Sequence, residues 1–213
     1  MSTSDLLSLS LVAVLVLTMV LWYRIPAPRP RLFRQAAWLF SAALLLEIWG
    51  FLARLKGWDN DVGYNLFQLY EFIVMLLLIR TAEPTLHRSV LWAGLIGVAG
   101  FVWRIRAQGG LGLLSADAIV IFAFLLSTLL VRSLFLLAKK CDTPLHRLPA
   151  FWFFFGCFLY FVGLVPLIAG IHLVYTSDRP LAAAIWFLVP ILAILRYAFA
   201  AWACRLEVAN KYL

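Results

Sequence analysis

Seven long apolar segments constrain this chain more than any other feature of its sequence. Each has about 20 mostly apolar residues, the length that an α-helix needs to cross the hydrocarbon core of a bilayer. The predicted spans are residues 5–23, 36–54, 62–80, 88–106, 115–138, 149–173 and 181–204. A segment in lipid must satisfy its own backbone polar groups, so these spans predict an all-α polytopic membrane protein, a bundle of seven transmembrane helices.

Composition agrees with a chain surrounded by lipid. Only 13% of the 213 residues are charged, about half the share usual in soluble domains. The spans occupy most of the sequence, so we expect a single transmembrane domain over residues 1–213. The first span lacks a basic region before it and a small-residue cleavage site after it, which favours a retained helix over a signal peptide.

The distribution of Lys and Arg predicts which end faces the cytoplasm. The loops on one side of the predicted bundle, with the C-terminal tail, carry twelve of these residues, and the loops on the other side carry five. The positive-inside rule then places the N-terminus outside and the C-terminus in the cytoplasm. The net charge of +8 is expected mostly on the inner surface. The orientation of the helices and contact with anionic membrane lipid headgroups are enough to explain it. No basic soluble module exists to bind nucleic acid, so no nucleic-acid partner is expected.

Two carboxylic acids lie inside predicted spans. Glu47 and Glu71 would sit roughly 10 and 13 Å from the outer boundary of the hydrocarbon. An ionisable group there costs about 2.5–3.5 kcal/mol on insertion scales, so both side chains are predicted to face the bundle interior. Tyr64, Gln68 and Glu71 recur at helical spacing with Asn65 beside them, and they form a polar stripe on an apolar helix.

These residues suggest a polar pocket in the outer half of the bundle. The predicted ligand-binding residues are Glu47, Asn65, Gln68, Glu71 and Tyr160, with Arg104 as the counter-ion. The alternatives are structural: the two acids as interhelical hydrogen-bonding groups, the two amides as bridges between helices, and Arg104 paired with Asp117 or extended to the interface. Arg196 is predicted to extend toward the inner leaflet.

Several classes of site are excluded or disfavoured. All four lysines lie at span ends or in loops, so no lysine is placed to form a retinal Schiff base. The three histidines form no HxxxH or HExxH pair, and the sequence has no GxSxG motif. The three cysteines are widely spaced. We therefore expect neither a metal nor another cofactor.

Three short elements carry a resemblance to a known group. They are Glu47 in the second span, NLFQLYEF (65–72) in the third and FWFFFGCFLYFVG (151–163) in the sixth. Together they resemble a family of small, uncharacterised bacterial seven-helix integral membrane proteins. The resemblance implies a seven-helix fold and a location in the bacterial inner (cytoplasmic) membrane, and it implies no reaction.

The leading functional hypothesis is a sensor or receptor-like module. A ligand would enter the polar pocket from outside, and a separate cytoplasmic or membrane signalling protein would receive the signal, because the chain has no output domain of its own. The alternatives are a metal-independent enzyme acting on lipid, with Glu47 and Glu71 as general acid and base, a small proton-coupled transporter, and a structural subunit.

Overall fold

Helices account for nearly all of the computed structural model, which describes residues 3–141, 143–175 and 177–212. The long helices are α1 (Thr3–Tyr23), α2 (Arg31–Lys56), α3 (Asp61–Ala82), α4 (His87–Ala107), α5 (Ala116–Lys140), α6 (Pro149–Val174) and α8 (Leu188–Tyr212), with the short α7 (Arg179–Trp186) before α8. Two 3-10 turns, η1 (Pro84–Leu86) and η2 (Leu145–Arg147), precede α4 and α6. No strand occurs among the described residues.

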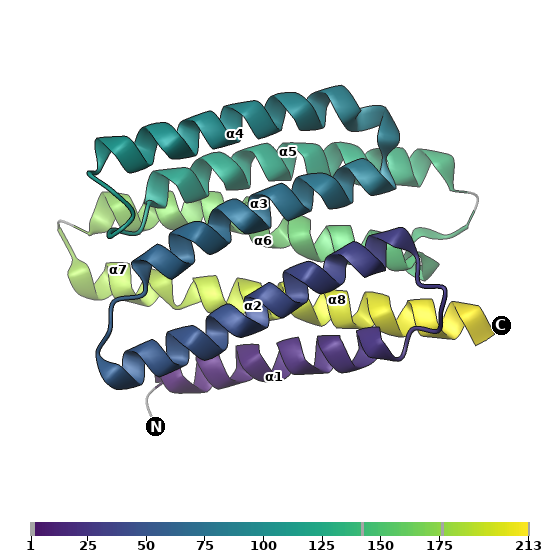
Figure 1. Ribbon diagram of the computed structural model, residues 1–213, viewed down its shortest axis with the longest axis horizontal. Coiled ribbons are helices and arrows are strands. Elements are labelled where there is room, and N and C mark those ends of the chain that lie inside the picture. Colours follow the sequence, from purple (N-terminus) through teal and green to yellow (C-terminus); the bar gives the residue numbers. More distant parts are fainter. Residues whose placement is uncertain (1–2, 142, 176, 213) are drawn as a thin grey trace.

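Seven helical segments are long and apolar enough to cross a membrane, α7 and α8 together forming the last. The prediction of an all-α, seven-span integral membrane protein is confirmed. α2 starts five residues before its predicted span, and α8 runs eight residues past the predicted end of the last one. α1 begins and α8 ends at opposite ends of the bundle (Figure 1).

The last span is divided into α7 and α8, whereas the sequence predicts one continuous segment over residues 181–204. Pro190 has no backbone N–H, so it cannot bond to the carbonyl of Trp186, and α7 ends there. α7 has its own start, because the Asp178 side chain accepts a hydrogen bond from the backbone N–H of Leu181 at 2.9 Å. Pro166, by contrast, lies inside an unbroken α6.

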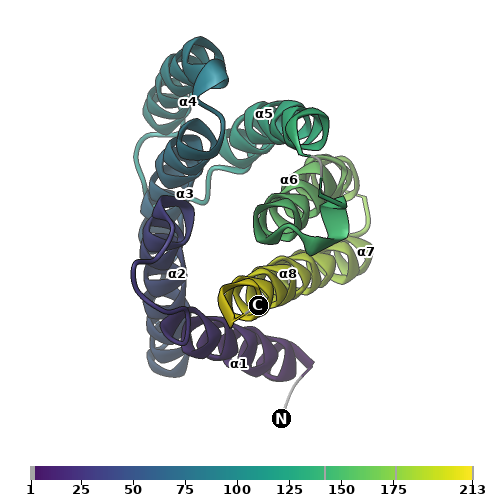
Figure 2. The ribbon, with the colours of Figure 1, turned by 90° about the vertical axis from the view of Figure 1, so that its right-hand side faces the viewer.

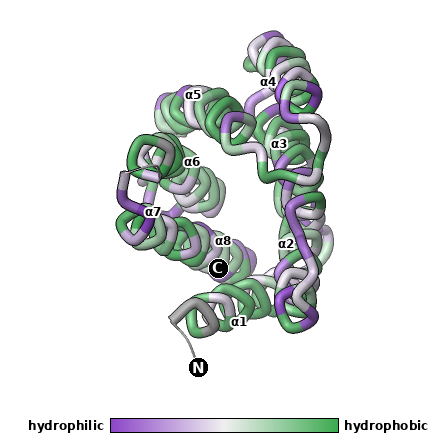
Figure 3. Tube along the Cα trace, turned by 90° about the vertical axis from the view of Figure 1, so that its left-hand side faces the viewer, coloured by the Kyte–Doolittle hydropathy of each residue, from purple (hydrophilic) through white to green (hydrophobic). Residues whose placement is uncertain are grey.

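Six of the spans form a ring. Following the contacts between helices, α1, α2, α3, α5, α6 and α8 meet in that order, and α8 packs back against α1 (Figure 2). α4 lies outside the ring against α3 and α5. Viewed from the end where α1 begins, the helices are coloured mostly hydrophobic (Figure 3). The connections α2–α3, α4–α5 and α6–α7 lie at this end, which we call the N-terminal end of the bundle.

A glycine allows α6 and α8 to pack closely. A Cβ atom on Gly156 would lie 2.6 Å from the Cβ of Phe199 and 3.2 Å from the backbone oxygen of Arg196. Both of those atoms are held by the backbone of α8, so any side chain at this position must push the two helices apart. Gly163, two turns away, faces the side chain of Leu192 of α8, whose Cδ1 would lie 2.7 Å from an added Cβ.

We therefore expect Gly156→Ala to lower the free energy of unfolding by about 1–3 kcal/mol, the usual cost of overpacking a tight contact. The measurement is reversible unfolding of the purified protein in mixed micelles. Gly170→Ala on the same helix is the matched control, because a Cβ there meets nothing within 4 Å. Equal stability of the two variants would contradict the close contact between α6 and α8.

Candidate functional site

A cavity of about 390 Å³ lies inside the ring of helices. Its lining residues come from α1, α2, α3, α5, α6, α7 and α8, and most of them lie nearer the N-terminal end of the bundle than the C-terminal end. Ser8, Arg54 and Tyr64 line it near the helix ends, whereas Tyr160, Arg196 and Tyr197 line its deepest part. The volume falls within the range of about 300–1,000 Å³ that is typical of small-molecule sites.

A buried ion pair closes the deep end of the cavity. Arg196 of α8 donates through its Nη1 to the Glu71 carboxylate of α3, and their side chains are 3% and 8% exposed. Both residues line the cavity. The pair links two helices that are not neighbours in the ring. It therefore neutralises both charges and fixes α8 against α3 at the cavity floor.

Aromatic side chains surround the Arg196 guanidinium. Its central carbon lies 4.8 Å from the ring centroid of Tyr160, 5.1 Å from that of Phe161 and 5.3 Å from that of Tyr197. A cation over aromatic faces is stabilised electrostatically, more so away from water. The prediction that Arg196 extends toward the inner leaflet is therefore wrong, because a carboxylate and three rings hold it inside the bundle.

An aromatic layer packs next to this floor. Phe40 of α2 meets Phe153 of α6 at a ring separation of 6.2 Å and Tyr197 of α8 at 6.3 Å, and all three side chains are buried. Phe40 lies on the same face of α2 as Glu47, seven residues nearer the C-terminal end of the bundle. The cavity lining includes Glu47 and Ala43 but not Phe40.

Glu47 of α2 and Gln68 of α3 are among the other polar side chains of the cavity wall. Glu47 is half-buried, and no ion pair or side-chain hydrogen bond involves it in the described parts of the protein. The buried Gln68 Oε1 atom likewise has no hydrogen-bond partner there. Glu47 and Glu71 thus both face the bundle interior, as predicted, but only Glu71 is paired.

Near the N-terminal end of the bundle, Arg54 donates from Nη2 to the Ser8 hydroxyl oxygen at 2.8 Å. This contact joins the end of α2 to the start of α1. Arg54 lies two helical turns from Glu47 on the same face of α2, and both line the cavity. Arg54 is not among the predicted site residues, because an arginine at the end of a span is usually an interfacial residue.

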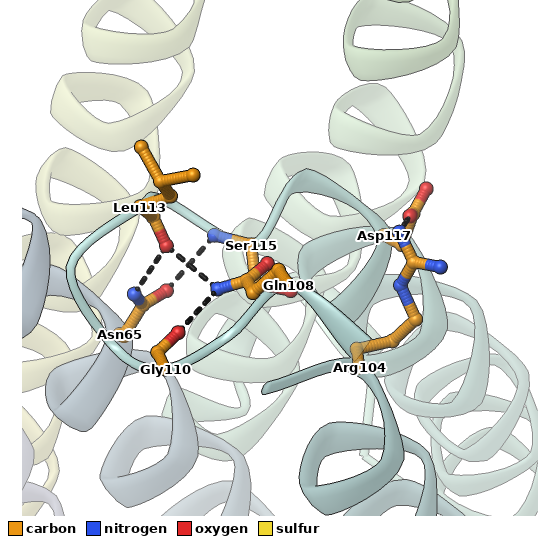
Figure 4. A network of polar contacts seen from close by, with 7 residues as sticks. All are labelled: Asn65, Arg104, Gln108, Gly110, Leu113, Ser115 and Asp117. Carbon is orange, nitrogen blue, oxygen red and sulfur yellow. Dashed lines mark hydrogen bonds and ion pairs between the residues drawn. The ribbon is translucent and has the colours of Figure 1, made fainter. Parts of the chain in front are cut away.

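Asn65 lies outside the cavity lining and holds a loop instead (Figure 4). Its Nδ2 donates to the backbone oxygens of Leu111 and Leu113 at 2.9 and 2.8 Å, and its Oδ1 accepts from the backbone N–H of Ser115 at 3.0 Å. Asn65 is fully buried. Its amide therefore serves the backbone of the α4–α5 connection, the structural alternative considered for this residue.

Arg104 also lies outside the cavity lining. It pairs with Asp117 across the α4–α5 connection, where their side chains are 32% and 42% exposed (Figure 4). The counter-ion of the buried acid is thus Arg196 rather than Arg104. Four of the six predicted site residues, Glu47, Gln68, Glu71 and Tyr160, line one cavity, and Asn65 and Arg104 do not.

The described residues contain no group of three or more His, Cys, Asp or Glu side chains that could hold a metal ion. Their three cysteines are free, and Cys157 and Cys204 are buried. Comparison with protein-family models, with curated proteins and with solved structures finds no match to this chain.

Proposed function

We propose that the protein is a receptor-like membrane module that binds a small molecule in the cavity between its helices. The observation that carries this proposal is the cavity of about 390 Å³, which extends from Arg54 near the helix ends to the Glu71–Arg196 pair. Mostly apolar walls with a few polar groups are typical of ligand sites. The binding residues would be Glu47, Gln68, Glu71 and Tyr160, with Arg54 near the entrance.

The proposal includes an orientation and a partner. The excess of Lys and Arg in the loops at the C-terminal end favours the cytoplasm there, so the cavity would open to the outside, as in a bacterial inner membrane. A separate cytoplasmic or membrane protein would receive the signal at the C-terminal end, where the loops carry most of the Lys and Arg residues.

The alternatives gain less support from the geometry. An enzyme using Glu47 and Glu71 as acid and base needs two carboxylates that are free to exchange protons, but the Glu71 carboxylate forms an ion pair with Arg196. A transporter needs a polar path to both surfaces. The aromatic layer of Phe40, Phe153 and Tyr197 instead fills the bundle beside the cavity floor.

Binding can be tested with a fluorescent apolar probe, N-phenylnaphthylamine, on protein held in nanodiscs. We expect saturable binding to the unmodified protein and a loss of about tenfold or more in affinity for Ala193→Phe, which fills the cavity with a ring. Ala198→Phe is the matched control, because this residue of the same helix is exposed outside the cavity. Equal probe binding by both variants would contradict binding in the cavity.

Orientation can be tested by cysteine labelling in intact cells. Asp59→Cys places a thiol in the exposed α2–α3 connection, and the native Cys141 follows α5 at the opposite end. We expect a membrane-impermeant maleimide to label Asp59→Cys in intact cells and Cys141 only after permeabilisation. The reverse pattern would place the cavity mouth toward the cytoplasm and contradict the proposed orientation.

A further inference from the structure

Two hydrogen-bond acceptors face the cavity without donors. The Glu47 carboxylate has no partner among the described side chains, and the buried Oε1 of Gln68 has none either. The two residues lie on neighbouring antiparallel helices, nine residues before the end of α2 and seven residues after the start of α3. At 1.5 Å per residue both are thus about 10–13 Å from the N-terminal helix ends.

The other charged side chains of the described cavity lining each have a side-chain partner, and of these only Glu71 and Arg196 neutralise each other. Arg196 pairs with Glu71 at the floor, and Arg54 donates to Ser8 near the entrance. Glu47 is therefore the one charged side chain in the described cavity lining that has neither an ionic nor a hydrogen-bonded partner. Glu47 is half-buried. A carboxylate partly removed from water without a partner is costly, and a ligand that brings a positive charge and N–H donors would lower that cost.

Apart from Ser8 and the hydroxyl groups of three tyrosines, the rest of the wall is apolar. Between the entrance and the floor it is built from aliphatic and aromatic side chains, among them Leu11, Leu15, Phe67, Phe122, Leu164 and Ile168. Phe122 stacks on Phe72 with ring centroids 4.2 Å apart, so this part of the wall is held in place. Such a surface favours a hydrocarbon or aromatic body, and it offers no group to a ligand that is polar throughout.

From these observations we propose that the cavity binds an amphipathic amine, a molecule with an apolar body and one protonated amino group that meets Glu47 and Gln68. An ammonium group carries donors and no acceptor, which matches two unpartnered acceptors. An alcohol of the same shape could satisfy only part of this demand, and a carboxylate would face Glu47 with like charge. This inference rests on the proposed function and specifies the ligand of the same site.

The test compares three compounds that share one apolar body: phenylbutylamine, phenylbutanol and phenylbutyrate. Each displaces N-phenylnaphthylamine from the nanodisc-held protein, and its half-displacing concentration is measured. We expect the amine to displace the probe at about a ten- to hundredfold lower concentration than the alcohol, the range for a hydrogen bond to a charged group. Glu47→Gln should abolish this preference while the probe still binds.

Asp59→Asn is the control for attraction of the amine by net charge. Asp59 is exposed at the same end of the bundle and lies outside the cavity lining, so this variant should keep the preference for the amine. The inference is overturned if the alcohol or the carboxylate displaces the probe as well as the amine does, or if the preference survives in Glu47→Gln. In those cases the cavity remains a binding site, whereas absence of probe binding overturns both proposals.

Discussion

Arg196→Leu alone is expected to lower the free energy of unfolding by about 3–5 kcal/mol, because it leaves the buried Glu71 carboxylate without its partner. Glu71→Leu should cost a similar amount, since the guanidinium is then left among Tyr160, Phe161 and Tyr197 without a countercharge. The measurement is reversible unfolding in mixed micelles. Substituting Glu71 therefore tests folding as well as binding, which makes Glu47 the better position for binding experiments.

The double variant Glu71→Leu/Arg196→Leu distinguishes an ion pair from two independent contributions. Replacing a whole buried pair by apolar residues is often close to neutral, so we expect the double variant to recover most of the stability that each single variant loses. The resulting double-mutant cycle gives the coupling energy of the pair. If the double variant loses the sum of the two single losses, Glu71 and Arg196 do not act as a pair.

The second large effect is expected at Asn65. Asn65→Ala removes hydrogen bonds to the backbone groups of Leu111, Leu113 and Ser115, of which Leu113 keeps a bond from the Gln108 side chain at 2.8 Å. Two backbone groups at about 1–3 kcal/mol each would then lack partners, and partial exposure to water reduces the loss to about 2–3 kcal/mol. Unfolding free energy and hydrogen exchange over residues 108–115 provide the measurement.

Gln108→Ala is the control for this loop. Its amide donates to Gly110 and Leu113 within the same segment but from a more exposed position, so its loss should stay below about 1 kcal/mol. We expect hydrogen exchange in the loop to accelerate far more for Asn65→Ala. Equal effects of the two substitutions would mean that Asn65 does not organise the α4–α5 connection.

The sequence predicts the spans because their signal is local. Long apolar runs and the cost of charges in lipid are enough to place seven helices and to turn Glu47 and Glu71 inward. The division of the last span follows from Pro190. A proline inside a span does not always predict a break, because neighbouring groups can satisfy the carbonyl that it leaves without a hydrogen bond. In α6, Pro166 causes no division.

The partners of the polar residues are distant in the sequence, so the sequence pattern alone does not predict them. Glu71 and Arg196 are 125 residues apart, and which face of α8 meets α3 depends on the order of helices around the ring. Depth along a straight helix suggested that Arg196 could reach the interface. The aromatic neighbours Tyr160, Phe161 and Tyr197 were a usable signal, because rings at this depth can hold a cation inside the bundle.

The same limit applies to Asn65. Its position beside the polar stripe of α3 was visible in the sequence, but its partners are backbone groups of an irregular segment with no periodic pattern. Buried amides most often bond to backbone or water, so the stripe alone could not distinguish a ligand contact from a loop contact.

Because the last span is divided, α8 is a separate helix that begins beside the cavity. α8 is continuous from Leu188, beside the cavity, to Tyr212 at the far surface, a length of about 37 Å. Near its far end, Lys211 donates to the backbone oxygens of Pro26 and Pro28 in the α1–α2 connection. A change in the tilt of α8 at the cavity would therefore displace these Lys211 contacts on the opposite side of the bilayer, without any additional domain.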